Sequence, residues 1–123
     1  LSLKIPLSHL YNGGQANDLQ QIKVKQFKME MQKKSFLMAS EVKYVNQKSE
    51  IKNLESLIES DKRLIDLREQ IRETADAQLT NGVITATEYL TELNNEDLAK
   101  QALILHEIQL LQAKQNLKLI LGQ

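Results

Sequence analysis

The distribution of helix-breaking residues constrains this chain more than any other feature of its sequence. The single proline and the four glycines lie within the first fourteen residues, at Gly82 and at Gly122. Nothing interrupts a helix between Gln15 and Asn81, or between Val83 and Leu121. Helices of globular domains average about 11–12 residues, so stretches this long are typical of coiled coils or of the staves of a helical barrel.

The segment 81–85 predicts a sharp reversal between two long helices. Gly82 can adopt the left-handed conformation that ends a helix, because it has no Cβ atom. Thr85 and Glu88 have the spacing of a capping box, in which each side chain binds the backbone N–H of the other residue. We therefore expect an all-α fold, an αα-hairpin with its turn at Gly82.

The two helices, residues 15–80 and 86–123, should pack antiparallel as a coiled coil of unequal arms. Residues that face each other should then have numbers adding to about 165. The stripes expected to meet are Leu54, Leu57, Asp61, Leu64, Arg68, Ala75 and Leu79 on the first helix, and Ala86, Leu90, Asp97, Gln101, Ile104, Ile108 and Leu111 on the second. In this register Arg68 lies opposite Asp97, and we expect a contact between them that fixes the register.

The long helix is expected to extend beyond its partner, because Leu121 pairs with about Tyr44 in this register. Residues 15–43 then have no partner within the chain, yet they carry an apolar stripe. Its members are Val24, Phe27, Met31, Met38, Val42 and Val45, and the first five are our candidates for an oligomer interface. A further apolar set lies off the expected hairpin interface, at Leu37, Ile51, Ile58, Ile65, Leu98, Leu105 and Leu119. Helices with more than one apolar face have neighbours on more than one side, so we expect a larger helical assembly.

The first fourteen residues predict a different element. Residues 1–5 alternate apolar and polar side chains and are followed by Pro6, a pattern that favours a short β-strand, with a turn over residues 7–14. A strand of this length is not stable alone, so its partner strands would come from elsewhere. Because the chain also opens on Leu1 rather than Met, we interpret it as a piece of a longer protein.

The composition argues against several functions. The chain has no cysteine, which excludes disulfides, thiolate metal ligands and cysteine nucleophiles. Sixteen basic and sixteen acidic residues cancel, so no electrostatic footprint for nucleic acid is expected. No catalytic triad pattern or phosphate loop occurs, and we expect neither an enzyme nor a cofactor. His106 lacks partners at metal-ligand spacing and should form a surface hydrogen bond near Glu59.

Several short motifs follow one another in a characteristic order. They are Ile5-Pro6-Leu7, Gly13-Gly14, the turn from Leu79 to Thr85, Glu88-Tyr89-Leu90, and Leu119-Ile120-Leu121-Gly122. Their order and spacing resemble the C-terminal repeat of the TolC family of bacterial outer-membrane efflux proteins, over essentially the whole chain. The resemblance implies a homotrimer with two repeats per subunit, in which residues 1–14 contain the end of an outer-membrane β-barrel strand, at residues 1–5, and the turn from this strand into the helix. It implies that the helices form a mostly periplasmic α-barrel together with the protein's own N-terminal repeat.

The resemblance also implies that the turn is the periplasmic tip and docks a periplasmic adaptor protein, which joins an inner-membrane pump. The tip residues would be Leu79, Asn81, Gly82, Val83 and Ile84. Leu79 and Ile84 depart from a Tyr and an Arg that are common at the family's tip. Glu88 and Glu92 would be candidates for an acidic ring at the pore entrance, although a capping role for Glu88 and a solvated position for Glu92 are the plainer interpretations.

Two functions are compatible with these patterns. The first is a passive exit duct of a tripartite efflux or secretion system, which exports drugs, small toxic molecules or proteins. The alternative is a coiled-coil scaffold or tether without a pore. The expected strand before Pro6 favours the duct, because a tether has no need of a barrel strand. The duct further predicts a second copy of the pattern about 200 residues upstream in the parent gene, by analogy with two-repeat architectures.

Overall fold

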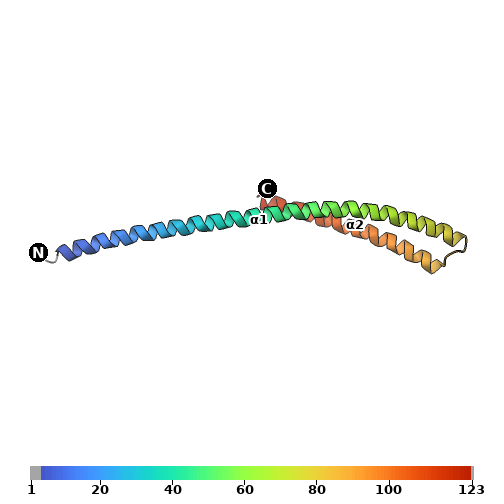
Figure 1. Ribbon diagram of the computed structural model, residues 1–123, viewed down its shortest axis with the longest axis horizontal. Helices are drawn as coiled ribbons and strands as arrows, with labels where there is room; N and C mark the ends of the chain where they lie inside the picture. Colours follow the sequence, from blue (N-terminus) through green and yellow to red (C-terminus); the bar gives the residue numbers. More distant parts are fainter. Residues whose placement is uncertain (1–3, 123) are drawn as a thin grey trace. The chain divides into compact units, whose positions relative to one another are not determined.

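The structure is a computed structural model that describes residues 4–122 of the 123-residue chain, with side chains from Ala16 to Gly122. Over this range it contains two α-helices, α1 (Lys4–Thr80) and α2 (Ala86–Ile120), and no strand. The chain divides into two units, Leu1–Val42 and Lys43–Gln123. The second unit is a helical hairpin, formed by the C-terminal part of α1 and by α2 (Figure 1).

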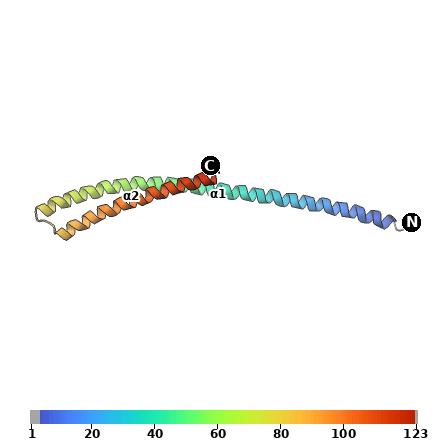
Figure 2. The same cartoon turned by 180° about the vertical axis from the view of Figure 1, so that it is seen from behind.

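The two helices of this hairpin run antiparallel and lie side by side in views from opposite directions (Figures 1 and 2). Helix α1 ends at Thr80 and α2 begins at Ala86, which confirms both helix boundaries predicted around the turn. Helix α2 ends at Ile120, and Gly122 follows with a φ of +74°. The all-helical hairpin expected from the sequence is therefore present.

The side chains shielded at the contact between α1 and α2 recur at alternating spacings of three and four residues, as in a coiled coil. We call this set the hairpin seam. On α1 it consists of Gln47, Ile51, Leu54, Ile58, Asp61, Ile65, Arg68, Arg72, Ala75 and Leu79. On α2 it consists of Tyr89, Glu92, Glu96, Ala99, Leu103, His106, Leu110, Ala113, Leu117 and Ile120. Three of its most buried members are alanines, with Ala75 and Ala113 at 4% exposure and Ala99 at 6%, so the two backbones can approach closely.

The predicted interface is correct on part of α1 and wrong on α2. Five of the seven α1 positions lie in the seam: Leu54, Asp61, Arg68, Ala75 and Leu79. Leu57 and Leu64 are instead exposed, and Ile51, Ile58 and Ile65, expected off the interface, lie in the seam. On α2, Ala86, Leu90, Asp97, Gln101, Ile104, Ile108 and Leu111 are all exposed.

The reason for the error on α2 is that this helix carries two stripes with coiled-coil spacing. The predicted interface used the stripe that contains Leu90, Ile104, Ile108 and Leu111. The structure turns the other stripe toward α1, because its alanines permit close packing and its polar side chains find partners across the seam. The unmatched apolar stripe is left on the opposite side of α2.

The predicted strand and turn at the N-terminus are not seen in the described residues. Residues 4–14 belong to α1, and residues 1–3 of the expected strand lie outside the described range. A helix satisfies its own backbone hydrogen bonds, whereas a single strand cannot do so without a neighbour. Pro6 is compatible with this outcome because it falls within the first turn of α1, where backbone N–H groups have no helical partner.

Within the first unit, α1 exposes every described side chain from Ala16 to Ala39. The predicted oligomer-interface residues are all about half exposed or more: Val24 at 54%, Phe27 at 60%, Met31 at 48%, Met38 at 58% and Val42 at 57%. A second exposed apolar set lies roughly on the other side of this helix, at Leu19, Ile22, Met29, Phe36 and Leu37. No described helix combines the length and the apolar character that crossing a membrane requires.

Candidate functional site

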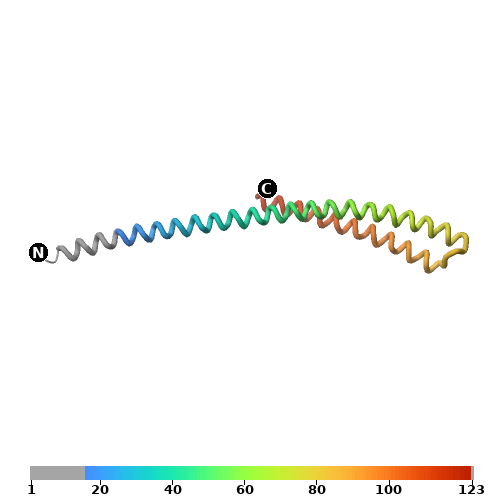
Figure 3. The backbone as a smooth tube through the Cα atoms, in the orientation of Figure 1, coloured from blue at the N-terminus to red at the C-terminus, as the bar shows by residue number. Residues whose placement is uncertain are grey.

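Figure 3 shows the backbone reversal between α1 and α2. At this turn the first helix ends with a Schellman motif. The Val83 N–H donates to the Gln78 carbonyl at 2.8 Å, and the Gly82 N–H donates to the Leu79 carbonyl at 3.0 Å. Gly82 has a φ of +71°, the left-handed conformation that this motif requires. Val83, at 69% exposure, presents its side chain to solvent. The turn therefore offers a hydrogen-bonded backbone and an apolar side chain at the end of the hairpin.

A complete capping box begins α2, as the sequence predicts. The Glu88 N–H donates to Thr85 Oγ1 at 3.2 Å, and the Thr85 N–H donates to Glu88 Oε2 at 2.7 Å. The Thr85 hydroxyl also donates to Glu88 Oε2, at 3.1 Å. The Glu88 carboxylate thus accepts hydrogen bonds from the Thr85 backbone N–H and from the Thr85 hydroxyl, and these two bonds, the backbone one first, lower the pKa of Glu88. Both bonds that Glu88 accepts from Thr85 use Oε2, which leaves Oε1 free to meet solvent or a partner.

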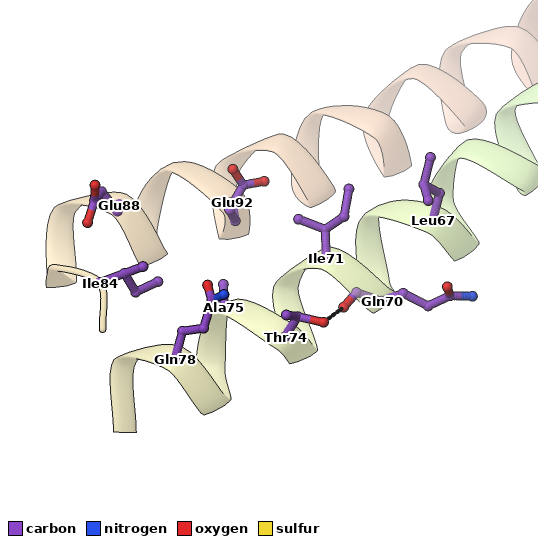
Figure 4. Close-up of a pocket in the computed structure, with 9 residues that line it drawn as sticks. All are labelled: Leu67, Gln70, Ile71, Thr74, Ala75, Gln78, Ile84, Glu88 and Glu92. Atoms are coloured by element: carbon purple, nitrogen blue, oxygen red, sulfur yellow. Dashed lines mark hydrogen bonds between the residues drawn. The ribbon is translucent and has the colours of Figure 1, made fainter. Parts of the chain in front are cut away.

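An open groove of about 500 Å³ lies between the two helices next to the turn (Figure 4). Helix α1 contributes Leu67, Gln70, Ile71, Thr74, Ala75 and Gln78, the turn contributes Ile84, and α2 contributes Glu88 and Glu92. The groove thus combines apolar side chains with two carboxylates and with neutral polar groups. Such a lining suits an apolar side chain of a partner that is accompanied by a cation or by hydrogen-bond donors.

Glu92 is the residue of α2 in this groove that lies farther from the turn (Figure 4). Its Oε2 atom is buried without a hydrogen-bond partner, and it lies 3.9 Å from Arg68 Nη1. This ion pair replaces the predicted contact between Arg68 and Asp97. That prediction is wrong because α2 is rotated relative to the expected register: Glu92 faces α1, whereas Asp97 is exposed.

A larger ionic cluster lies farther from the turn and was not predicted. The carboxylate of Glu96, which is 4% exposed, bonds Arg72 through Oε2 and Lys100 Nζ through Oε1 at 2.7 Å. Lys100 Nζ also lies 3.5 Å from Glu69 Oε1. The Lys100 hydrogen bond, followed by that of Arg72, lowers the pKa of Glu96. The same carboxylate raises the pKa of Arg72 and of Lys100.

Two further polar contacts cross the hairpin seam. His106 Nδ1 lies 2.5 Å from Asp61 Oδ2, and Gln47 Nε2 donates to the Ala113 carbonyl at 3.1 Å. The predicted partner region of His106 was Glu59, two positions from the residue that the structure pairs with it. The seam therefore has polar contacts at several levels between Gln47 and Arg72, which specify one register more strictly than apolar packing would.

The structure brings some of the predicted site residues together. One groove is lined by Ile84, Glu88 and Glu92. The turn next to this groove contains or adjoins Leu79, Asn81, Gly82 and Val83. Sequence reasoning missed the α1 wall of the groove, Gln70, Ile71, Thr74 and Gln78. It also missed the cluster around Glu96. The spacing of Glu96 and Lys100, four residues apart on one helix, was the available signal for that cluster.

Helix α2 also presents an unmatched face, which we call its outer face. It lies opposite the seam and consists of Leu90, Thr91, Asn94, Asp97, Leu98, Gln101, Ile104, Leu105, Ile108, Leu111, Gln112, Gln115, Lys118 and Leu119. Its large apolar side chains are exposed by 50% for Ile108 and by up to 70% for Leu111. Only two of its residues are charged. An exposed apolar face of this kind indicates an interaction surface.

Comparison with protein-family models, with curated proteins and with solved structures found no match for this chain. The fold and the candidate surfaces are thus interpreted from their own geometry. Among residues 16–122, no group of three or more His, Asp or Glu side chains is placed to hold a metal ion.

Proposed function

We propose that this chain forms part of the helical wall of an outer-membrane efflux channel, the passive exit duct of a tripartite efflux or secretion system. The observation that carries the proposal is the outer face of α2. A helix in a barrel wall has a neighbour on each side, so it needs two apolar faces in opposite directions. Helix α2 has the hairpin seam on one side and the outer face on the other.

The first helix of the hairpin supports the same arrangement. Leu57 and Leu64, each 41% exposed, and Leu67, at 52%, lie on one flank of α1 beside the seam. Charged side chains, among them Lys62 and Glu69, occupy the other flank. A second hairpin could therefore place its apolar α1 flank against the outer face of α2. Repetition of that contact, which joins two different surfaces, generates a closed ring when the rotation between neighbours is suitable.

In this proposal the turn at Gly82 is the periplasmic tip, and the groove beside it receives a helix of a periplasmic adaptor protein. The groove offers Ile71 and Ile84 to an apolar side chain and the carboxylates of Glu88 and Glu92 to a cationic one. A ring of Glu88 carboxylates, one from each subunit, would favour cations at the pore entrance. Its Oε1 atom is available for that role, since the capping contacts use Oε2.

The test is disruption of the gene that encodes this chain in its own host. The duct predicts higher intracellular accumulation of fluorescent efflux substrates, restored by the complemented gene. It also predicts recovery of the full-length protein with the outer membrane. Complementation with a Gly82→Pro variant should fail, since proline cannot adopt the positive φ of this turn. Unchanged accumulation together with absence from the outer-membrane fraction would overturn the proposal.

The alternative function is a helical scaffold or tether without a pore. The polar contacts along the hairpin seam favour it, because ion pairs and a fixed register are sufficient to make a rigid spacer. The same gene disruption distinguishes the two functions. A tether predicts unaltered dye accumulation and loss or mislocalisation of a bound partner.

A further inference from the structure

The outer face of α2 contains a second stripe with coiled-coil spacing. Its members are Asp97, Gln101, Ile104, Ile108, Leu111, Gln115 and Lys118, at alternating intervals of four and three residues. All seven are exposed. Over the segment that they span, about 33 Å at 1.5 Å per residue, this stripe meets no other described element of the hairpin, because α1 occupies the opposite side of α2.

This stripe has a symmetric pattern about its centre. Ile108 is the middle residue, Ile104 and Leu111 flank it, and a glutamine follows on each side at Gln101 and Gln115. The two ends carry opposite charges, Asp97 at one and Lys118 at the other. These are the only charged residues of the outer face. The chemical pattern is therefore the same from either direction, except that the charges are complementary.

We propose that the outer face of α2 binds the outer face of a second copy of this chain, antiparallel and about a twofold axis at Ile108. In that arrangement each Asp97 lies opposite Lys118 of the other copy, and Ile104 lies opposite Leu111. Gln101 and Gln115 pair through their amides, and Ile108 meets its own equivalent on the axis. A twofold contact requires a surface that is complementary to itself, and this stripe meets that requirement.

The hairpin seam supports this geometry, because it is an antiparallel contact of the same kind within one chain. There Arg72 pairs with Glu96 and Asp61 with His106, so oppositely polar side chains lie at the same level of facing stripes. The proposed dimer repeats this arrangement with Asp97 and Lys118. Leu98, Leu105 and Leu119, exposed by 52–67%, lie along one edge of the stripe and would be covered in the same contact.

The antiparallel dimer lies beyond the proposed function and occupies the face that the barrel wall would use. A chain held in the antiparallel dimer cannot place its outer face against the α1 flank of a neighbouring hairpin. The dimer is therefore a form of the free chain that covers this apolar face before the chain joins its assembly. It concerns association in solution, so its failure would leave the efflux test unaffected, and the reverse also holds.

The absence of cysteine from these 123 residues makes disulfide trapping a direct test in this chain. An Ile108→Cys variant should form a disulfide-linked dimer on mild oxidation, because the two sulfurs would lie close to the twofold axis. Gln109→Cys is the matched control, since its side chain is also exposed but points away from the outer face. Equal cross-linking of both variants, or none at Ile108→Cys, would overturn the proposal.

The orientation has its own test. Asp97→Cys should not cross-link with itself, because the two copies of this position would lie about 30 Å apart in the antiparallel dimer. A mixture of Asp97→Cys and Lys118→Cys chains should give a mixed dimer. Self-cross-linking of Asp97→Cys would indicate a parallel contact and would contradict the twofold arrangement.

Charge exchange tests the contact without cysteines. The single change Asp97→Lys places two lysines together at each end of the dimer and should weaken dimerisation about tenfold. The double change Asp97→Lys and Lys118→Asp restores both opposite-charge pairs, so it should recover most of the lost affinity. Failure of the double variant to exceed the single variant in sedimentation would show that these residues do not face each other.

Discussion

Gly82 is the residue whose backbone conformation the hairpin turn depends on most. Its φ of +71° lies in the left-handed region, where an L side chain collides with its own backbone. A Cβ atom built at this position meets nothing within 4 Å, so the surrounding space does not oppose a larger residue. The whole cost of a substitution is therefore conformational.

Gly82→Ala should destabilise the hairpin by about 1–2 kcal/mol, the usual penalty for the left-handed conformation. Gly82→Asn should cost less, because asparagine adopts this conformation more readily than alanine does. Urea unfolding followed by circular dichroism measures both changes. Equal losses for the two variants would indicate that the turn requires glycine for a reason other than φ.

Glu88 links the stability of the turn to pH. Its pKa is lowered below the ordinary 4.5 by the hydrogen bonds of Thr85, so the ionised form is favoured in the folded state. This contribution is complete above the unfolded pKa and is lost as the pH falls through the folded value. Glu88→Gln should therefore lower the free energy of unfolding near neutral pH. On acidification from about pH 6 to about pH 3, this variant should lose less of its free energy of unfolding than the wild type does. An identical acid loss in both proteins would contradict the capping role.

At the scale of the elements, the two helices are joined by a seam that contains many polar pairs. Glu96 is the most buried charged group in it, at 4% exposure, and it depends on both Arg72 and Lys100. Removal of one partner from a buried charge is costly, because the remaining group stays desolvated. Arg68 and Glu92 are farther apart, at 3.9 Å, and about one third exposed, so their pair should contribute less.

This difference predicts a ranking of three variants. Arg72→Ala should lower the melting temperature at least about twice as much as Arg68→Ala, and Asp97→Asn should change it by less than about 3 °C. The last result follows from the exposure of Asp97 on the outer face of α2. Thermal unfolding at a chain concentration low enough to exclude dimers gives the ranking. A large effect of Asp97→Asn there would favour the register in which Asp97 meets Arg68.

The ends of the helices could be predicted from the sequence because their signals are local. Gly82, Thr85 and Glu88 act through backbone groups within three residues, and the structure places each in its expected role. The interface of α2 could not be predicted in the same way. Two stripes of this helix have the right spacing, and the choice between them depends on partners such as Arg72 and Asp61, which are far away in the sequence.

At the scale of the whole molecule, the chain exposes apolar surface in both of its units. The first unit exposes two apolar faces of α1, and the hairpin exposes the outer face of α2. A sequence shows that such residues exist, but the identity of what covers them depends on molecules outside the chain. For this reason the hairpin could be predicted from the sequence, whereas the wall of an efflux duct and the antiparallel dimer are proposals.

These surfaces predict stepwise self-association. Because the stripe from Val24 to Val42 and the outer face of α2 are separate, the wild-type chain should form species larger than a dimer at tens of micromolar. Replacement of Phe27 and Met31 by glutamate places charge in the first stripe. The largest species of this variant should then be the dimer formed through the outer face of α2. Addition of Ile108→Asp should then give a monomer, because it places two carboxylates at the twofold axis. Sedimentation velocity distinguishes the three states, and a monomeric wild type would contradict both interfaces.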